Sequence, residues 1–404
     1  MKILILDTVH GGGILADKYP KMGDDVTCVD VYKVTPTEEI NRLIRKGYTV
    51  STEVPKGEYD TVLMPIHCPD SFLEGVIFKE RKFFGQSVGE LIDDDRFRIE
   101  VTGAKGKTSS CCLLAHVLTA AGRKVLVHTS RGRGRWADGR LDIEEKISIA
   151  PPSMLTLPDD DYDTVICEVS LGGSGKADIS CITNLMDDYP IAAGTRKASE
   201  GKMSILNKGT NIVPKDEIEF WKGYGIGNVI GYGGRIGVLG KPKLGDDVKI
   251  WVDYGKGFEV YLKKSYLALQ YLDAMEMVLE VCERMGIPES SVRDGLSSFI
   301  GVPGRGEISL LDGRWTITER NPGISACSVE RTFSILKEMD SLNGAVAVLN
   351  PVNKKVCCKM DIGAIKKVAA EYDVTMLIID GSGTMPVIPE STGPAIIFVK
   401  EGYT

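Results

Sequence analysis

Short apolar runs separated by glycine-rich or polar segments recur along this chain. In the N-terminal part, apolar runs at residues 2–6, 26–31 and 61–66 alternate with helical patterns, one starting near residue 14 and one over residues 37–45. Strands buried in parallel sheets read as continuous apolar runs, whereas helices repeat their apolar positions every three or four residues. The β-α-β-α-β order therefore predicts a small Rossmann-like domain over residues 1–94.

The same alternation of strands and helices continues through the rest of the chain. A turn at residues 302–307, rich in glycine and proline, separates a central domain, residues 95–301, from a C-terminal α/β domain, residues 302–404. Strands that alternate with helices indicate the α/β class with mostly parallel sheets. Strands are expected at residues 97–102, 124–129, 163–169, 179–183, 226–232, 248–253, 258–262, 315–319, 345–350, 374–380 and 395–399, and helices at residues 107–122, 267–285, 290–299, 325–339 and 361–372.

The most specific chemical pattern is VTGAKGKTSS at residues 101–110, between a strand pattern and a helix pattern. In such a turn, glycines bring backbone N–H groups close to phosphate, the helix N-terminus attracts anions, and Lys107 and Thr108 reach outer phosphates and Mg²⁺. Fewer residues separate its two glycines than in the general phosphate loop G-x-x-x-x-G-K-[ST]. The alternative is a chance Gly-Lys-Thr in a surface turn. The predicted nucleotide contacts here are Gly103, Ala104, Lys105, Gly106, Lys107, Thr108 and Ser109.

Polar residues end two neighbouring strands that follow this loop. Glu168 lies near the end of a buried strand, where a lone carboxylate is costly unless it is paired or bound to a metal ion. Asn184 follows the next strand, and the carboxyl ends of parallel strands are where α/β folds bind ligands. These positions predict a magnesium site beside the phosphate loop. Lys202, at the head of a further helix, is by itself an ordinary surface lysine.

Composition and charge narrow the class of protein. The 404 residues carry a net charge of −7 without a basic tail, which argues against nucleic acid as the main partner. The ten cysteines lack a C-x-x-C pair, so we expect reduced, mostly buried thiols. No apolar run has the length of a signal peptide or a membrane span, which predicts a cytoplasmic protein without a membrane partner. The run Arg131 to Arg135 suits an anionic ligand, with a solvated hairpin as the alternative.

Taken in order, these motifs resemble those of the Mur ligase family of ATP-dependent ligases. The short phosphate loop is similar to the family's G-x-x-G-K-[TS], and Asn184 with Asp188-Tyr189 resembles its T-N-x-x-x-D-H segment, with Tyr189 in place of a metal-ligating histidine. Residues 303–307, Pro-Gly-Arg-Gly-Glu, resemble the P-G-R-x-E hinge before the third domain. Asn321-Pro322 resembles the segment that opens it, although Glu319-Arg320 departs from the family spacing.

The resemblance implies a three-domain architecture, with a substrate domain at residues 1–94 and an ATP-binding domain at residues 95–301. It implies ATP and Mg²⁺ as cofactors and carboxylate activation as the reaction. Lys202 stands where many members carry a carbamylated lysine, and Asp273 stands where the family usually has asparagine on its adenine-side helix. The implied catalytic residues are Lys107, Glu168 and Lys202; the implied metal ligands are Thr108, Glu168 and Lys202; and the further nucleotide contacts are Asn184, Asp273 and Arg305.

Over its whole length the chain resembles one branch of this family, which closes a carbocyclic ring on a nickel-containing tetrapyrrole polycarboxylate. The absence of a sugar-nucleotide pattern in residues 1–94 agrees with that branch. The expected reaction joins an activated carboxylate to a ring carbon, with release of ADP and phosphate and without an amine co-substrate. Two alternatives stay open: an amide ligase that joins an amino acid or amine to a carboxylate, and a non-catalytic nucleotide-binding module.

Overall fold

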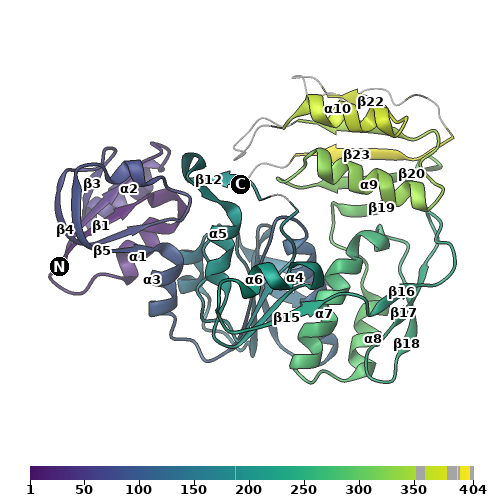
Figure 1. The fold of residues 1–404 in the computed structure, drawn as a ribbon, viewed down its shortest axis with the longest axis horizontal. Helices are drawn as coiled ribbons and strands as arrows, with labels where there is room; N and C mark the ends of the chain where they lie inside the picture. The colour runs from purple at the N-terminus through teal and green to yellow at the C-terminus, as the bar shows by residue number, and fades with distance from the viewer. Residues whose placement is uncertain (187, 352–359, 380–388, 390–391, 401–404) are drawn as a thin grey trace. The chain divides into compact units, whose positions relative to one another are not determined.

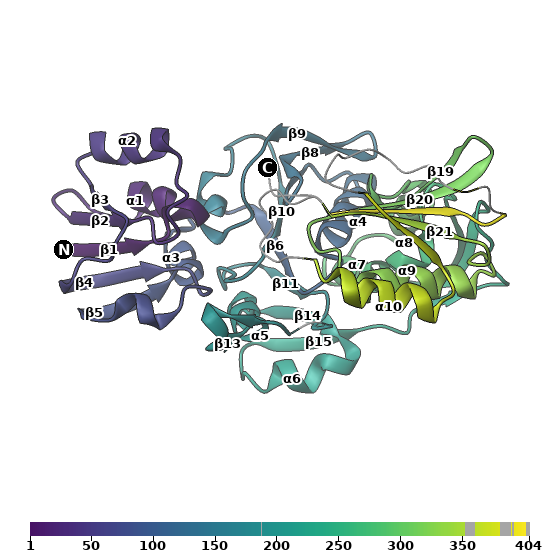
Figure 2. The same cartoon turned by 90° about the horizontal axis from the view of Figure 1, so that it is seen from above.

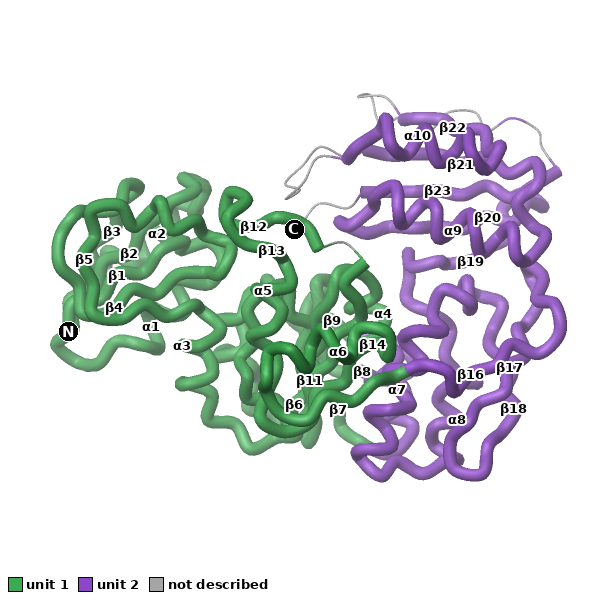
Figure 3. Tube along the Cα trace, in the orientation of Figure 1, with its two compact units in different colours: residues 1–111, 123–135, 142–232 green, residues 112–122, 136–141, 233–404 purple. Residues whose placement is uncertain are grey.

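The computed structural model describes residues 1–186, 188–351, 360–379, 389 and 392–400. The chain divides into two compact units, which are coloured separately in Figure 3. The first unit comprises residues 1–111, 123–135 and 142–232, and the second comprises residues 112–122, 136–141 and 233–404. Among the described residues, no helix has both the length and the apolar character needed to cross a membrane.

The N-terminal part of the first unit is a five-stranded parallel sheet in the order β3-β2-β1-β4-β5 (Figures 1 and 2). Alternate residues of the central strand enter different cores. Ile3 and Ile5 pack with residues of the three helices, whereas Leu4 and Leu6 pack with Cys68 from the loop after β4. Burial on both faces explains why this strand is continuously apolar. The elements are β1 Lys2–Leu6, α1 Gly13–Lys18, β2 Asp25–Val29, α2 Thr37–Arg45, β3 Thr49–Ser51, β4 Gly57–Met64, β5 Val76–Phe83 and α3 Phe84–Leu91.

The central sheet has eight strands in the order β15-β14-β11-β6-β10-β7-β8-β9. The first six of these run parallel, and β8 returns antiparallel to β7. Strand β6 lies between β10 and β11, so the loops that follow these three strands meet at one edge of the sheet. Its elements are β6 Phe97–Thr102, α4 Lys107–Ala120, β7 Val125–Thr129, β8 Gly132–Ala137, β9 Arg140–Glu145, β10 Thr164–Glu168, β11 Ile179–Ile182, α5 Ala198–Lys202, β14 Thr210–Pro214, α6 Ile218–Lys222 and β15 Asn228–Tyr232.

The second unit holds an antiparallel three-stranded sheet, β16-β17-β18, and a five-stranded sheet in the order β19-β20-β23-β21-β22. Within the latter, β19 pairs antiparallel and the other strands run parallel, with α9 and α10 packed against each other (Figure 1). Its elements are β16 Ile236–Val238, β17 Val248–Val252, β18 Phe258–Leu262, α7 Leu272–Arg284, α8 Glu289–Ser298, β19 Arg305–Leu311, β20 Arg314–Arg320, α9 Ala326–Glu338, β21 Val346–Asn350, α10 Ile362–Glu371, β22 Thr375–Ile378 and β23 Ala395–Val399.

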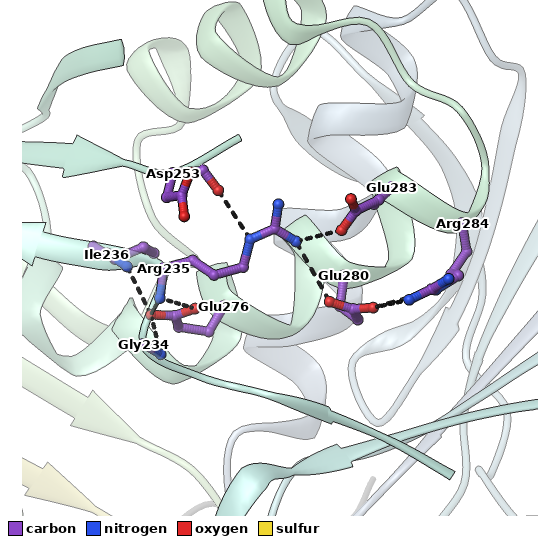
Figure 4. A network of polar contacts seen from close by, with 8 residues as sticks. All are labelled: Gly234, Arg235, Ile236, Asp253, Glu276, Glu280, Glu283 and Arg284. Atoms are coloured by element: carbon purple, nitrogen blue, oxygen red, sulfur yellow. Dashed lines mark hydrogen bonds and ion pairs between the residues drawn. The ribbon is translucent and has the colours of Figure 1, made fainter. Parts of the chain in front are cut away.

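A buried carboxylate fixes the segment that enters β16 to helix α7 (Figure 4). Glu276 accepts backbone N–H groups from Gly234, Arg235 and Ile236, at 3.0, 2.9 and 2.9 Å. The Arg235 guanidinium in turn pairs with Glu283 at 2.7 Å on the same helix. Burial raises the pKa of Glu276, although the three N–H groups oppose the shift. This carboxylate thus satisfies three successive donors that would otherwise lack an acceptor.

These elements confirm the α/β class with mostly parallel sheets. The arginine-rich run forms β8, which makes an antiparallel hairpin with β7, as one of the two alternatives expected. The hairpin is not solvated throughout, because Arg133 is buried with an ion pair to Glu145 and hydrogen bonds to Ser153 and Thr156. Binding of an anionic ligand by this run stays a prediction. Of the eight described cysteines, seven are buried and all are free thiols, and Cys357 and Cys358 lie outside the described residues. The domain bounds 1–94, 95–301 and 302–404 stay a prediction.

Candidate functional site

The phosphate loop connects β6 to α4 in a conformation that requires glycine. Gly103 and Gly106 have φ values of 138° and 82°, in the left-handed region that other residues rarely adopt. A Cβ atom on Gly103 would also collide with the hydroxyl and backbone nitrogen of Thr183. The loop therefore lies directly on the end of β11, as the strand order of the sheet dictates.

The segment after β11 holds the loop in shape. Asn184 accepts the N–H of Ala104 at its backbone oxygen, at 2.8 Å, and the N–H of Lys105 at its side-chain oxygen, at 3.1 Å. Thr183 donates its hydroxyl to the Lys105 carbonyl at 2.5 Å. The structure thus brings Asn184 to the loop, as a residue that orders its backbone.

A hydroxyl and a carboxylate meet at the start of α4. Thr108 donates its hydroxyl to Oε2 of Glu168 at 2.8 Å, and the backbone N–H of Ser130 donates to the same oxygen at 3.0 Å. The Ser130 hydroxyl lies 3.2 Å from that of Thr108. Glu168 is 3% exposed, and these donors offset the cost of burying its charge. Hydroxyl and carboxylate oxygens are ligands that Mg²⁺ prefers, so Thr108 and Glu168 fit a magnesium ion chemically.

Ser130 is a site residue that the sequence reading missed. It follows β7, the neighbour of β10 in the sheet, and this adjacency places it against Glu168. The available signal was its position at the end of a predicted strand. The reading instead gave weight to the arginines that follow it.

Lys202 corrects the sequence reading in two respects. It ends helix α5 instead of heading a helix, and it is 1% exposed instead of lying on the surface. Its Nζ donates to the carbonyl oxygens of Gly103 at 3.0 Å and Ser170 at 3.2 Å. Burial, followed by the charge of Lys107, lowers the pKa of Lys202 well below its usual value. Lys107 folds back onto the loop, with its Nζ 3.1 Å from the same Gly103 carbonyl.

The acid and aromatic residue that precede α5 support this lysine. Asp188 accepts the backbone N–H and hydroxyl of Ser199, at 2.7 and 2.9 Å, in the first turn of α5. The ring centroid of Tyr189 lies 6.0 Å from the Lys202 nitrogen. Asp188 is thus engaged in holding the helix that carries Lys202. Asp187 lies outside the described residues.

Two predicted nucleotide contacts belong to the second unit. Asp273, in the first turn of α7, pairs with Arg331 of α9 at 2.7 Å. Arg305 begins β19, and its backbone oxygen accepts the Tyr271 hydroxyl at 2.9 Å. Their contact with a nucleotide stays a prediction, whereas Gly103 to Ser109, Glu168, Asn184 and Lys202 gather around one loop in the first unit.

Comparison with known proteins shows which proteins this chain resembles. Residues 101–188 match the family model of the Mur ligase middle domain. Coenzyme F(430) synthetase of Methanosarcina acetivorans is 26% identical over 411 residues, covering 90% of this chain and 86% of that protein. Coenzyme F(430) synthetase of Methanocaldococcus jannaschii is 25% identical over 406 residues, covering 94% of this chain and 91% of that protein.

Several solved structures resemble this chain in fold. UDP-N-acetylmuramate–alanine ligase MurC of Thermotoga maritima has a TM-score of 0.54 at 16% identity, covering 100% of this chain and 96% of that chain. MurF of Acinetobacter baumannii has a TM-score of 0.57 at 12% identity, covering 98% and 90%. Folylpolyglutamate synthetase of Lactobacillus casei has a TM-score of 0.54 at 14% identity, covering 78% and 90%.

Proposed function

Since this chain is an ATP-dependent ligase with a Mur ligase middle domain in a Mur-ligase-like fold, we propose that it is a coenzyme F(430) synthetase. Its substrate is then the nickel-containing tetrapyrrole polycarboxylate seco-F-430 acid. The enzyme activates a side-chain carboxylate with ATP, joins it to a ring carbon, and releases ADP and phosphate. The observation that carries this proposal is the similarity to two synthetases of that name over at least 90% of this chain.

The proposed reaction requires that a carboxylate, which is a poor electrophile, be made reactive. A carboxylate resists attack until its oxygen becomes part of a good leaving group, which phosphoryl transfer from ATP provides as an acyl phosphate. The reaction has two half-reactions: formation of the acyl phosphate, and displacement of its phosphate by the nucleophile. Negative charge moves in both, so the site has to supply cations and hold the reacting groups in position. The residues gathered around the phosphate loop fit this requirement.

We assign the roles around the loop as follows. Backbone N–H groups of residues 103–109 bind the phosphates, and Lys107 swings from the Gly103 carbonyl to the β- and γ-phosphates. Thr108 and Glu168 would hold a magnesium ion, which would supply positive charge against the phosphates. Asn184 keeps the loop in its binding shape. Asp273 and Arg305, in the second unit, stay predicted nucleotide contacts.

Lys202 is assigned as the carbamylated lysine. Its low pKa favours the neutral amine, whose nitrogen attacks CO₂, forming an N–C bond and releasing one proton. The carbamate would offer an anionic oxygen ligand for a second magnesium ion. Tyr189 stands where the resemblance implies a metal-ligating histidine, so this chain would not supply that ligand.

One experiment separates this function from its alternatives. The full chain is incubated with ATP, Mg²⁺ and the nickel seco-acid, with and without added amino acids, and ADP, phosphate and the ring-closed product are measured. The proposal predicts stoichiometric ADP and product without any amine. Dependence on an amine would instead indicate an amide ligase, and ATP binding without turnover a non-catalytic module. A Lys107→Ala variant that stays folded is expected to release no ADP.

A further inference from the structure

A buried aspartate holds two histidines at the carboxyl edge of the N-terminal sheet. Asp7 follows β1, is fully buried, and accepts Nδ1 of His10 at 2.6 Å and Nε2 of His67 at 3.2 Å, both at Oδ2. Its other oxygen accepts the backbone N–H of His10 at 3.1 Å. Both hydrogen bonds from His10 therefore converge on one carboxylate. The second ring nitrogen of His10, Nε2, has no partner among the residues that the structure describes.

The backbone of Asp7 has a strained conformation that directs its carboxylate toward His10. Asp7 has a φ of 64°, in the left-handed region that aspartate adopts only at a cost. This conformation ends β1 abruptly and turns the carboxylate back toward His10. Tyr32, from the loop after β2, lies edge-on to His10, with 5.9 Å between ring centroids, and fixes the ring from one side. His10 nevertheless keeps 41% of its side chain exposed, so a substrate can reach Nε2.

The same edge of the sheet joins the part of the first unit that carries Lys202. Arg196, two residues before the start of α5, donates to the carbonyl oxygens of Ile66 and Cys68, at 3.1 and 3.0 Å. These two residues flank His67. Ile66, Leu171 and Tyr189 pack against one buried cluster, whose members are Ile191, Ala192 and Ala198. The loop that carries His67 is therefore held against the segment that leads into α5 and Lys202.

A metal ion is the competing use for this cluster. Ligand atoms of Asp7, His67 and Cys68 lie within 4.8 Å of one another. However, Oδ2 of Asp7 already accepts hydrogen bonds from two histidine rings, so its lone pairs are engaged. The cluster is therefore better suited to hold a histidine ring than to hold a cation.

We propose that His10, oriented by Asp7, is the general base that deprotonates the carbon nucleophile in ring closure. This inference rests on the proposed function, because an amine carries its own lone pair whereas a C–H carbon has none. His10 Nε2 takes the proton, and the electron pair of the C–H bond forms the C–C bond to the acyl carbon. The bond from that carbon to the phosphate oxygen breaks, and inorganic phosphate leaves. Asp7 is the positioning residue that keeps the proton on Nδ1 and the lone pair on Nε2.

The test is to separate the two half-reactions in a His10→Gln variant of the full chain. Enzyme, ATP, Mg²⁺ and the nickel seco-acid react with hydroxylamine present, which traps an acyl phosphate as the hydroxamate. The variant is expected to release ADP at close to the wild-type single-turnover rate and to accumulate hydroxamate. Its ring closure is expected to fall on the order of 100-fold or more, as loss of a general base does. Asp7→Asn keeps the shape of the side chain and tolerates the left-handed backbone. This variant should also retain ADP release and lose ring closure, but with a smaller loss than His10→Gln.

A matched control and two contrary results make the test decisive. His116→Gln, which alters a histidine hydrogen-bonded to Ser298 and Trp136 in the second unit, is expected to leave both half-reactions unchanged. Wild-type ring closure by His10→Gln would overturn the base assignment, as would equal loss of ADP release, hydroxamate and product in a folded variant. If the wild-type protein releases no ADP with the seco-acid, the proposed function itself fails, and the inference falls with it.

Discussion

The side-chain nitrogen of Lys202 lies 3.0 Å from the carbonyl oxygen of Gly103, a residue 99 positions earlier in the chain. This contact couples the end of helix α5 to the first glycine of the phosphate loop. Lys107 contacts the same carbonyl, so two lysine nitrogens converge on one acceptor in a buried site. Burial, and after it the charge of Lys107, lowers the pKa of Lys202 and favours its neutral form.

Replacing Lys202 by methionine should abolish most of the turnover without unfolding the chain, because methionine retains the apolar stem and removes only the nitrogen. We expect at least a 100-fold lower kcat for ADP release. In wild-type protein, ¹³C-bicarbonate should give a carbamate NMR signal that Lys202→Met lacks. Lys208→Met, at an exposed position nearby, is the control. Wild-type turnover in Lys202→Met would return this lysine to a purely structural role.

The Thr108 hydroxyl is expected to act through magnesium. Thr108→Val removes the donor to Glu168 and the proposed metal ligand, whereas Thr108→Ser keeps both. We expect the valine variant to need at least about tenfold more Mg²⁺ for half-maximal ADP release, which corresponds to about 1.4 kcal/mol. A magnesium titration of all three proteins measures this. Equal magnesium requirements would exclude Thr108 as a ligand.

Glu276 should matter for stability more than any surface acid on the same helix. Glu276→Ala leaves three N–H groups, those of Gly234, Arg235 and Ile236, without their acceptor, and should destabilise the second unit by about 2 kcal/mol or more. Hydrogen exchange at these three amides should become faster. Glu283→Ala removes only a half-exposed ion pair with Arg235 and should cost less than about 1 kcal/mol. Equal protection of the three amides in both variants would contradict this account.

Glu319 should make the stability of the second unit depend on pH. Burial raises the pKa of Glu319 to about 7, although the Gln270 hydrogen bond and the Arg305 charge oppose the shift. The folded state therefore holds its proton more tightly than the unfolded state does. This contribution to stability is fully present below the pKa that Glu319 has in the unfolded chain. It is lost as the pH rises toward 7, the pKa in the folded state, and the loss levels off above pH 7.

The Glu319→Gln variant tests the prediction that stability falls as pH rises. Glutamine keeps the shape and cannot ionise, so the variant should gain up to about 3 kcal/mol relative to wild type between pH 4.5 and 7.5. Thermal or urea unfolding of both proteins across this range gives the difference. A difference that does not change with pH would show that Glu319 has the same pKa in both states.

Helices and strands with a clear apolar pattern in their own residues were predicted from the sequence. Helix α2, Thr37–Arg45, and strands β6, Phe97–Thr102, and β18, Phe258–Leu262, were predicted at their observed bounds. Strand β5, Val76–Phe83, was missed because it is an exposed edge strand whose residues 79–82 are all charged, so it lacks an apolar run. Helix α3, Phe84–Leu91, was missed with it because its two glycines interrupt the helical pattern.

The candidate site likewise has a part that local sequence predicts and a part that it does not. The sequence pattern of the phosphate loop can be recognised because it consists of contiguous residues. The burial of Lys202 could not be predicted, because it arises from contacts with Gly103 and Ser170, which are distant in sequence. The Asp7–His67 contact likewise joins residues 60 positions apart, so no spacing within one element indicates it. Strand order, which sequence patterns do not specify, decides both.

The two glycines of α3 have a consequence for protein engineering. A Cβ on Gly85 would strike the carbonyl oxygens of Gly172 and Gly173, and one on Gly89 would strike that of Ser174. The helix of the N-terminal domain therefore lies backbone to backbone on the loop that follows Glu168. A chimera that grafts another N-terminal domain onto the central sheet would need small residues at both positions, or the graft would displace the loop that follows β10.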